Sequence, residues 1–95
     1  METLRAMRNI TRNFSNDRRR FNRKLKKAGI KFEWHPLFEG YQWTFEKFPG
    51  GDIALHAGTY GARRGYFESY CMPWDEGDVS VLTATEAVQH LTEGK

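Results

Sequence analysis

The chain has little of several features that would assign a function directly. Its single cysteine, Cys71, has no partner for an internal disulfide, so a reducing compartment is the natural setting. Its three histidines lie far apart without the paired spacing of a metal site, and no apolar run is long enough to span a membrane. The basic N-terminus lacks the apolar stretch of a signal peptide. We therefore expect a soluble cytoplasmic protein that needs no metal or cofactor.

Acidic residues are scarce in the first third of the chain. Residues 1–31 hold eleven Lys and Arg against two acids, a net charge of +9. Residues 32–95 hold four bases and ten acids, a net charge of −6, so the overall +3 conceals a basic segment joined to an acidic body. A field of one sign concentrates ligands of the opposite sign. The asymmetry predicts an anionic partner for the basic segment.

The periodicity of the apolar residues predicts a helix at the start of the chain. Spacings of three, four and seven favour helix over residues 2–28, and Gly29 is suited to end it. Good N-cap residues at 15–17 leave open an interruption near Ser15, which would give two short helices. The predicted basic helical arm is therefore residues 1–29 of a single domain.

After Gly29 the period changes to two, which predicts strands. The expected strands are 30–35, 41–46, 52–57, 66–72 and 79–82. A capping box formed by Thr83 and Glu86 then opens a C-terminal helix over residues 83–93, with Gly94 closing it. The predicted fold is α+β: the N-terminal helix, an antiparallel sheet of four to five strands within residues 30–82, and the short C-terminal helix.

Basic side chains form a stripe along the predicted N-terminal helix. At about 100° per residue they fall in a narrow sector beside the apolar one. Arg18 is the exception, because it lands inside the apolar sector. A guanidinium group is permanently charged and its forked donors match phosphate oxygens. The stripe, and with it the candidate site for nucleic acid or another partner, consists of Arg5, Arg8, Arg12, Arg19, Arg23 and Lys26.

The sequence leaves other roles for the basic segment open. Residues 18–24 resemble the arginine-rich motifs that bind RNA grooves as helices. The same charges would also suit an acidic protein surface, or they would simply solvate a helix face. A basic amphipathic helix also fits a membrane surface. A domain of this size needs the apolar face for its own core, however, so we expect no membrane partner.

A glycine-rich loop at residues 58–65 is a second candidate. Its backbone amides and the side chains of Arg63 and Arg64 would suit an anion. It matches neither the phosphate-loop pattern nor the dinucleotide fingerprint. We favour a long hairpin turn whose glycines supply positive φ, with Arg63 and Arg64 as a second contact for the partner.

Candidates for catalysis are weak. Cys71 lies in the predicted fourth strand, and we expect it to be buried. A pair of His56 and Glu68 on neighbouring strands would support a small hydrolase, which we keep as a minor alternative. Four acidic residues form a further group: Glu68, Asp75, Glu76 and Asp78. They would bind a divalent ion only if their loop folded round it, and they lack the ligand pattern of a calcium loop. We therefore expect no enzyme and no metal site.

From Phe48 to Glu93 the chain resembles a group of small bacteriophage proteins. The matching segments are Phe48–Gly51, Gly58–Gly61 with Gly65, and Thr83–Leu91. These are mostly turn and core residues, so the resemblance implies a phage origin and a fold. Many small phage proteins inhibit host machinery, including DNA-targeting defence complexes. By that association the resemblance implies an anti-CRISPR-type inhibitor.

The leading hypothesis is a non-enzymatic binding protein whose basic helix engages nucleic acid or a host nucleoprotein complex. The second hypothesis is a protein-directed inhibitor of a host defence complex, which would bind an acidic surface or block a nucleic-acid channel. A homodimer is a further expectation if Phe14 and Phe21 do not pack on the sheet, because they would then pair two subunits.

Overall fold

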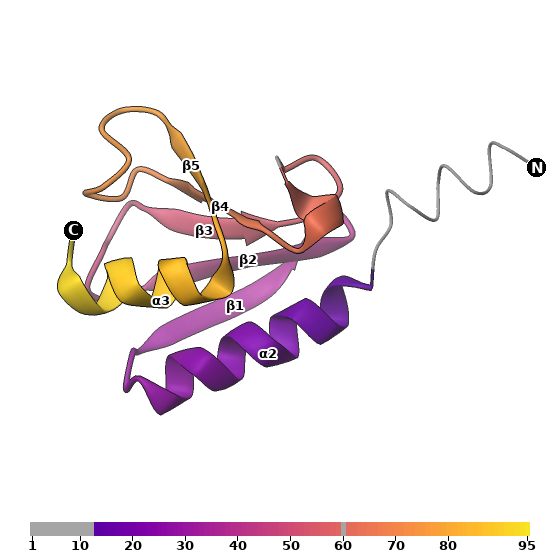
Figure 1. Cartoon of the computed structure of the whole chain (residues 1–95), viewed down its shortest axis with the longest axis horizontal. Coiled ribbons are helices and arrows are strands. Elements are labelled where there is room, and N and C mark those ends of the chain that lie inside the picture. The colour runs from indigo at the N-terminus through magenta and orange to yellow at the C-terminus, as the bar shows by residue number, and fades with distance from the viewer. Residues whose placement is uncertain (1–12, 60) are drawn as a thin grey trace, which may run out of the picture.

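The computed structural model of the chain describes residues 13–59 and 61–95 and confirms the predicted α+β fold (Figure 1). A helix comes first, a five-stranded sheet follows, and a second helix ends the chain. The elements in chain order are α2 (Phe14–Lys27), β1 (Phe32–Leu37), β2 (Gly40–Phe45), β3 (Asp52–Leu55), the 3₁₀ turn η1 (Ala62–Arg64), β4 (Phe67–Tyr70), β5 (Val79–Leu82) and α3 (Ala84–Glu93).

The sheet is an antiparallel meander in which each strand pairs with the next along the chain. β1 and β5 are therefore its edge strands. Phe38 and Glu39 join β1 to β2 with φ of 47° and 62°, and two positive φ values suit the twist of a two-residue hairpin turn. In the resulting register Trp43 of β2 lies opposite Trp34 of β1 on one side and Ile53 of β3 on the other.

α2 begins later than the sequence predicts. Asn13 caps it, with a non-helical ψ of 84° and a side-chain oxygen that accepts a hydrogen bond from Ser15 N at 3.1 Å. A helix running unbroken through Asn13 is therefore wrong, because an N-cap residue must leave helical geometry to bond the first free amides. Asn13 lies two residues before Ser15, near which the sequence leaves open an interruption, and residues 1–12 are outside the described part of the chain. At the other end Gly29 has φ +73°, as a residue after a helix often does.

Both helices pack on the same face of the sheet. α2 buries Phe14, Phe21 and Leu25, and α3 buries Ala87 and Leu91. These side chains form one cluster with inward-facing residues of β2 to β5: Trp43, Phe45, Ile53, Leu55, Phe67 and Leu82. The capping box predicted for the C-terminal helix is confirmed. Because Phe14 and Phe21 are buried, they are not available to pair two subunits.

Most strand ends differ from the predictions by one or two residues. β1 continues through Pro36 to Leu37, because a residue without an N–H is tolerated on an edge strand. β3 ends at Leu55 rather than at residue 57, and β4 is only Phe67–Tyr70. Cys71 therefore follows the strand, has φ 58° and is exposed, so its predicted burial is wrong.

The two helices that the structure describes are short and polar on one side. Within residues 13–59 and 61–95, no helix has the length and apolar character needed to cross a membrane.

Candidate nucleic-acid interface

The exposed surface of α2 carries charge of one sign. The helix holds seven bases and one acid, and that acid, Asp17, is buried. Within the described part of the chain, none of the exposed bases of α2 forms an ion pair with an acidic side chain. The exposed bases are Arg19, Arg20, Arg23, Lys26 and Lys27. Their charges are therefore open to an external anion.

The structure places the described part of the predicted stripe on this surface. Arg19, Arg23 and Lys26 are exposed, and at about 100° per residue they lie within about 60° of one another around the helix axis. Arg5, Arg8 and Arg12 lie outside the described residues. The stripe stands on a rigid support, because the opposite side of the same helix is part of the core.

Three further bases of α2, Arg20, Lys24 and Lys27, lie on its other flank, toward α3. Lys24 and Lys27 line a shallow pocket with Thr85 and Val88 of α3. Arg20 lies on the same flank by helical geometry. α2 thus has two basic flanks with different surroundings, which allows each to be tested separately.

Arg18, the exception to the sequence pattern, has an aromatic environment. Its guanidinium carbon lies 4.6 Å from the centre of the Trp34 ring and 5.0 Å from that of Tyr41, and Nη1 donates a hydrogen bond to the Tyr41 hydroxyl at 3.3 Å. Arginine stacks on aromatic faces because its positive charge meets the negative ring face. Arg18 lies at the border of the apolar sector, where α2 faces the rings of Trp34 and Tyr41 and not the aliphatic core. A charged side chain is therefore favourable at this position.

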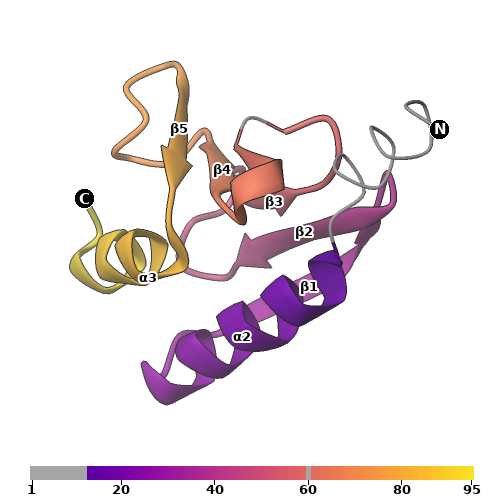
Figure 2. The same ribbon diagram turned by 45° about the vertical axis from the view of Figure 1, so that its right-hand side comes forward.

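β1 projects beyond the cover that α2 provides. Trp34 is on the same face of the sheet as its pair Trp43, yet Trp34 is 39% exposed and Trp43 is fully buried. Phe32 precedes Trp34 on this face and is half-buried. We call the exposed face formed by Phe32 and Trp34 the β1 shelf. Strand β1 itself lies beside α2 in Figures 1 and 2.

A wall of α2 side chains borders the β1 shelf. Lys26, Phe32 and Trp34 line one groove, and Arg18 stacks on Trp34. Asn22, between these two positions on the helix, accepts a hydrogen bond from Trp43 Nε1 at 2.7 Å. Sequence reasoning missed the shelf, because alternation assigns Trp34 to the core face without showing that its strand is at the edge. Arg18 within the apolar sector was the available signal.

The glycine-rich loop forms a turn around η1, as favoured. Gly61 and Gly65 flank η1 with φ of 75° and 76°. These values lie in the left-handed region, which glycine adopts far more readily than other residues. Arg63 and Arg64 are exposed on η1. In Figure 1 η1 lies toward the side of the molecule where α2 begins. The two arginines therefore sit on a separate element from the stripe, near the same end.

The acidic group does not form a metal site. Asp75 is buried, and its two oxygens accept hydrogen bonds from Ser69 Oγ at 2.7 Å and from Met72 N at 3.0 Å. Its carboxylate thus stabilises the turn after β4. Across residues 13–59 and 61–95 no group of three or more His, Cys, Asp or Glu side chains is arranged to hold a metal ion.

The face of the sheet away from the helices carries a polar chain across three strands. His35 Nε2 and Gln42 Oε1 are 2.6 Å apart, and Gln42 Nε2 donates to Asp52 Oδ2 at 2.7 Å. Burial raises the pKa of the Asp52 carboxyl above its ordinary value of 3.8; the hydrogen bond from Gln42 opposes the shift, and nearby Glu68 adds to it. His56, which with Glu68 forms the predicted catalytic pair, accepts a hydrogen bond from Gly58 N within its own loop.

Replacing Asp52 by Asn is expected to raise the melting temperature at pH 7. The pKa of Asp52 is higher in the folded protein than in the unfolded chain, so folding disfavours its charged form. The free energy of unfolding therefore decreases as pH rises and Asp52 becomes ionised. Asn keeps an oxygen for Gln42 and removes the charge. Thermal melts at pH 7 and pH 3 check this: the gain should vanish at pH 3, where Asp52 is protonated in both states. A lower melting temperature for Asp52→Asn at pH 7 would contradict it.

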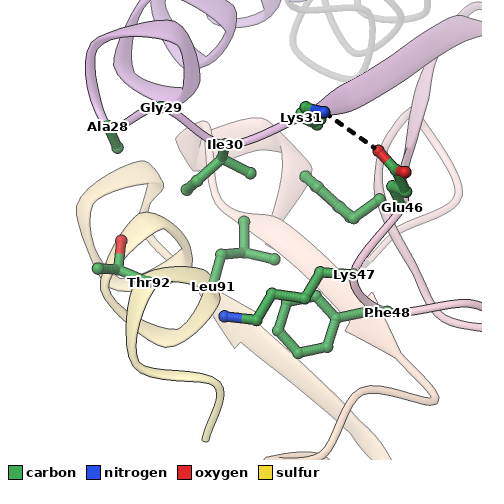
Figure 3. Close-up of a pocket in the computed structure, with 10 residues that line it drawn as sticks. Ala28, Gly29, Ile30, Lys31, Glu46, Lys47, Phe48, Leu91 and Thr92 are labelled. Carbon is green, nitrogen blue, oxygen red and sulfur yellow. Dashed lines mark ion pairs between the residues drawn. The ribbon is translucent and has the colours of Figure 1, made fainter.

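A separate pocket lies where the C-terminal ends of the two helices meet the turn after β2. Ile30, Phe48 and Leu91 form the apolar walls of this pocket (Figure 3). At its rim Lys31 Nζ lies 4.0 Å from Glu46 Oε2. Lys47 extends across the opening in the same view. The lining contains no histidine or cysteine, and Glu46 is its one acid.

The residues that the structure brings together thus form a basic stripe, the β1 shelf beside it, and a stacked arginine, Arg18, that links the two.

Comparisons with protein-family models, with curated proteins and with solved structures found nothing that matches this chain.

Proposed function

We propose that this protein is a non-enzymatic binding protein that holds nucleic acid against the exposed basic face of α2. The observation that carries the proposal is the one-signed surface of that helix: five exposed bases, and a single acid that is buried. The phosphate backbone is the most abundant partner for such a surface, and contacts with it supply most of the affinity in non-specific binding.

The support beneath the bases favours binding over mere solvation. Arg19 and Arg23 project from a helix whose opposite face packs against Trp43 and Phe67 through Phe21. Bases on a rigid scaffold lose less conformational entropy on binding than bases on a disordered tail. Arg63 and Arg64 on η1 extend the positive surface at the end where α2 begins.

A phage origin and a role as an inhibitor of a host defence complex stay predictions from the sequence. Such an inhibitor would also use the basic face, but against an acidic protein. Competition separates the two: free nucleic acid competes for the α2 face if nucleic acid is the direct ligand. If the ligand is an acidic protein surface, labelled nucleic acid shows no binding near physiological salt.

The double replacement of Arg19 and Arg23 by Gln is expected to weaken nucleic-acid binding by about tenfold at 0.15 M salt. Two phosphate contacts are lost, so the negative slope of log affinity against log salt should become less steep by roughly 1.4 to 1.8. Fluorescence anisotropy of labelled oligonucleotides over a salt series measures both quantities. Thermal stability should change little, because both side chains are exposed.

The matched control replaces Arg20 and Lys27 by Gln. It removes the same charge from the same helix, but from the flank that borders the stripe on the side toward α3, where Lys27 lines a pocket with Thr85 and Val88. The control should lose less affinity than the stripe variant, because its two side chains add to the positive field around the ligand without contacting the phosphates held by the stripe. Equal losses would show that net charge alone matters, and absence of binding by the parent protein would overturn the proposal.

A further inference from the structure

The β1 shelf is unusual because it leaves a large aromatic side chain open on the helix-covered side of the sheet. A side chain on that face normally contributes to the core, as Trp43 does. Trp34 instead keeps 39% of its surface exposed at the edge strand. Burying an indole is favourable at about 25 cal/mol per Å² of apolar surface. Leaving one open beside a binding surface therefore suggests that a ligand covers it.

Contacts on the protein side hold the exposed ring in place. The Arg18 guanidinium stacks on it at 4.6 Å, and the Tyr41 ring meets it edge-on, with centroids 5.5 Å apart. The Tyr41 hydroxyl is in turn 3.1 Å from Ser15 Oγ and accepts a hydrogen bond from Arg18. Trp34 is thus an ordered platform, and its remaining surface points to solvent.

The platform and the basic stripe adjoin each other along α2. Lys26 belongs to both, because it lies in the stripe with Arg19 and Arg23 and lines the groove with Trp34. By helical geometry Arg19 lies within about 20° of Lys26 around the axis. A ligand with negative charge along one side and flat rings along the other would contact both surfaces at once.

We propose that the ligand of this surface is single-stranded nucleic acid, with a base stacked on Trp34 and phosphates on Arg19, Arg23 and Lys26. This inference rests on the proposed function and names its substrate class. A single strand presents free base faces, and aromatic platforms beside basic grooves are how proteins bind it without sequence preference. A duplex keeps its base faces stacked inside, so it would use the stripe and leave Trp34 uncovered.

The test compares the binding of a labelled twelve-nucleotide single strand, as oligo-dT and oligo-U, with that of a twelve-base-pair duplex. The parent protein should bind the single strands more tightly than the duplex at 0.15 M salt. Trp34→Ala should weaken single-strand binding by about tenfold or more, since a stacked base is worth that much on alanine substitution. Duplex affinity should change by less than about twofold.

Phe38→Ala is the matched control. Phe38 is an aromatic residue with 75% exposure in the turn after β1, and its ring contacts His56 outside the groove. Its removal should leave both affinities unchanged. Trp34→Phe keeps a ring on the shelf and should retain most single-strand affinity, which guards against a fold defect in the alanine variant. Binding of oligo-dT should also quench tryptophan fluorescence in the parent protein more than in Trp34→Phe.

The outcomes separate the inference from the proposed function. Duplex binding that depends on Arg19 and Arg23 but exceeds single-strand binding would overturn the inference and leave the proposed function standing. So would unchanged oligo-dT affinity in a folded Trp34→Ala variant. Failure of every oligonucleotide to bind would overturn both. Binding of an acidic extended peptide in place of any oligonucleotide would assign the groove to a protein partner and would also overturn both.

Discussion

Phe21→Ala is expected to remove a large part of the free energy of unfolding. Phe21 is fully buried at the centre of α2, and its ring centroid lies 5.0 Å from that of Trp43 and 4.5 Å from that of Phe67. Truncating a buried phenylalanine costs about 3–5 kcal/mol. A domain of this size has about 5–14 kcal/mol in total. Urea unfolding followed by circular dichroism and tryptophan fluorescence should show a midpoint far below that of the parent protein.

Arg20→Ala serves as the control for Phe21→Ala, because Arg20 is adjacent on the same helix and exposed. It should change the free energy of unfolding by no more than about 0.5 kcal/mol. If Phe21→Ala instead left the midpoint unchanged, α2 would be a separable arm rather than part of the core. The nucleic-acid surface would then lack the rigid support on which the proposed function depends.

Asp75→Ala is expected to destabilise the fold by about 2–4 kcal/mol. The change removes the two carboxylate oxygens of Asp75, so the donors Ser69 Oγ and Met72 N each lose their acceptor. The loss extends further, because Ser69 Oγ also accepts a hydrogen bond from Trp74 Nε1 at 3.0 Å. A buried donor left unpaired costs its full desolvation energy. Thermal and urea unfolding of the variant measure the loss.

Two companions separate the acceptor role of Asp75 from its charge. Asp75→Asn keeps one acceptor oxygen and should lie between the parent protein and the alanine variant. Glu76→Ala removes an exposed carboxylate from the adjacent position and should have little effect. Equal stability of Asp75→Ala and Glu76→Ala would show that the buried hydrogen bonds contribute nothing net.

The order and type of the elements could be predicted because they depend on local patterns. The change of apolar period at Gly29 marks the passage from helix to strand, and the Thr83 and Glu86 capping box fixes the start of α3 within a residue. The start of α2 was less certain, because several residues near Ser15 are good caps and only the fold selects Asn13.

The candidate site could be predicted only in its charged half. Arg19, Arg23 and Lys26 are visible as a stripe because charge and helical period are properties of the sequence. The shelf depends on which strand is at the edge and on how far α2 covers it, and both are properties of the tertiary structure. Trp34 therefore has the pattern of a core residue, and Arg18 appears misplaced until its aromatic partners are known.

The same helix supplies a large part of the core and carries a crowded set of like charges. Arg19 and Arg23, like Arg20 and Lys24, are four residues apart, where two positive side chains repel each other and weaken a helix. A bound polyanion relieves that repulsion, and any ligand that binds only the folded state adds to its stability by mass action. If the α2 face binds nucleic acid as proposed, the free energy of unfolding is therefore lower for the free protein than for the complex. In a cell, the unliganded form would be the one that proteases remove first.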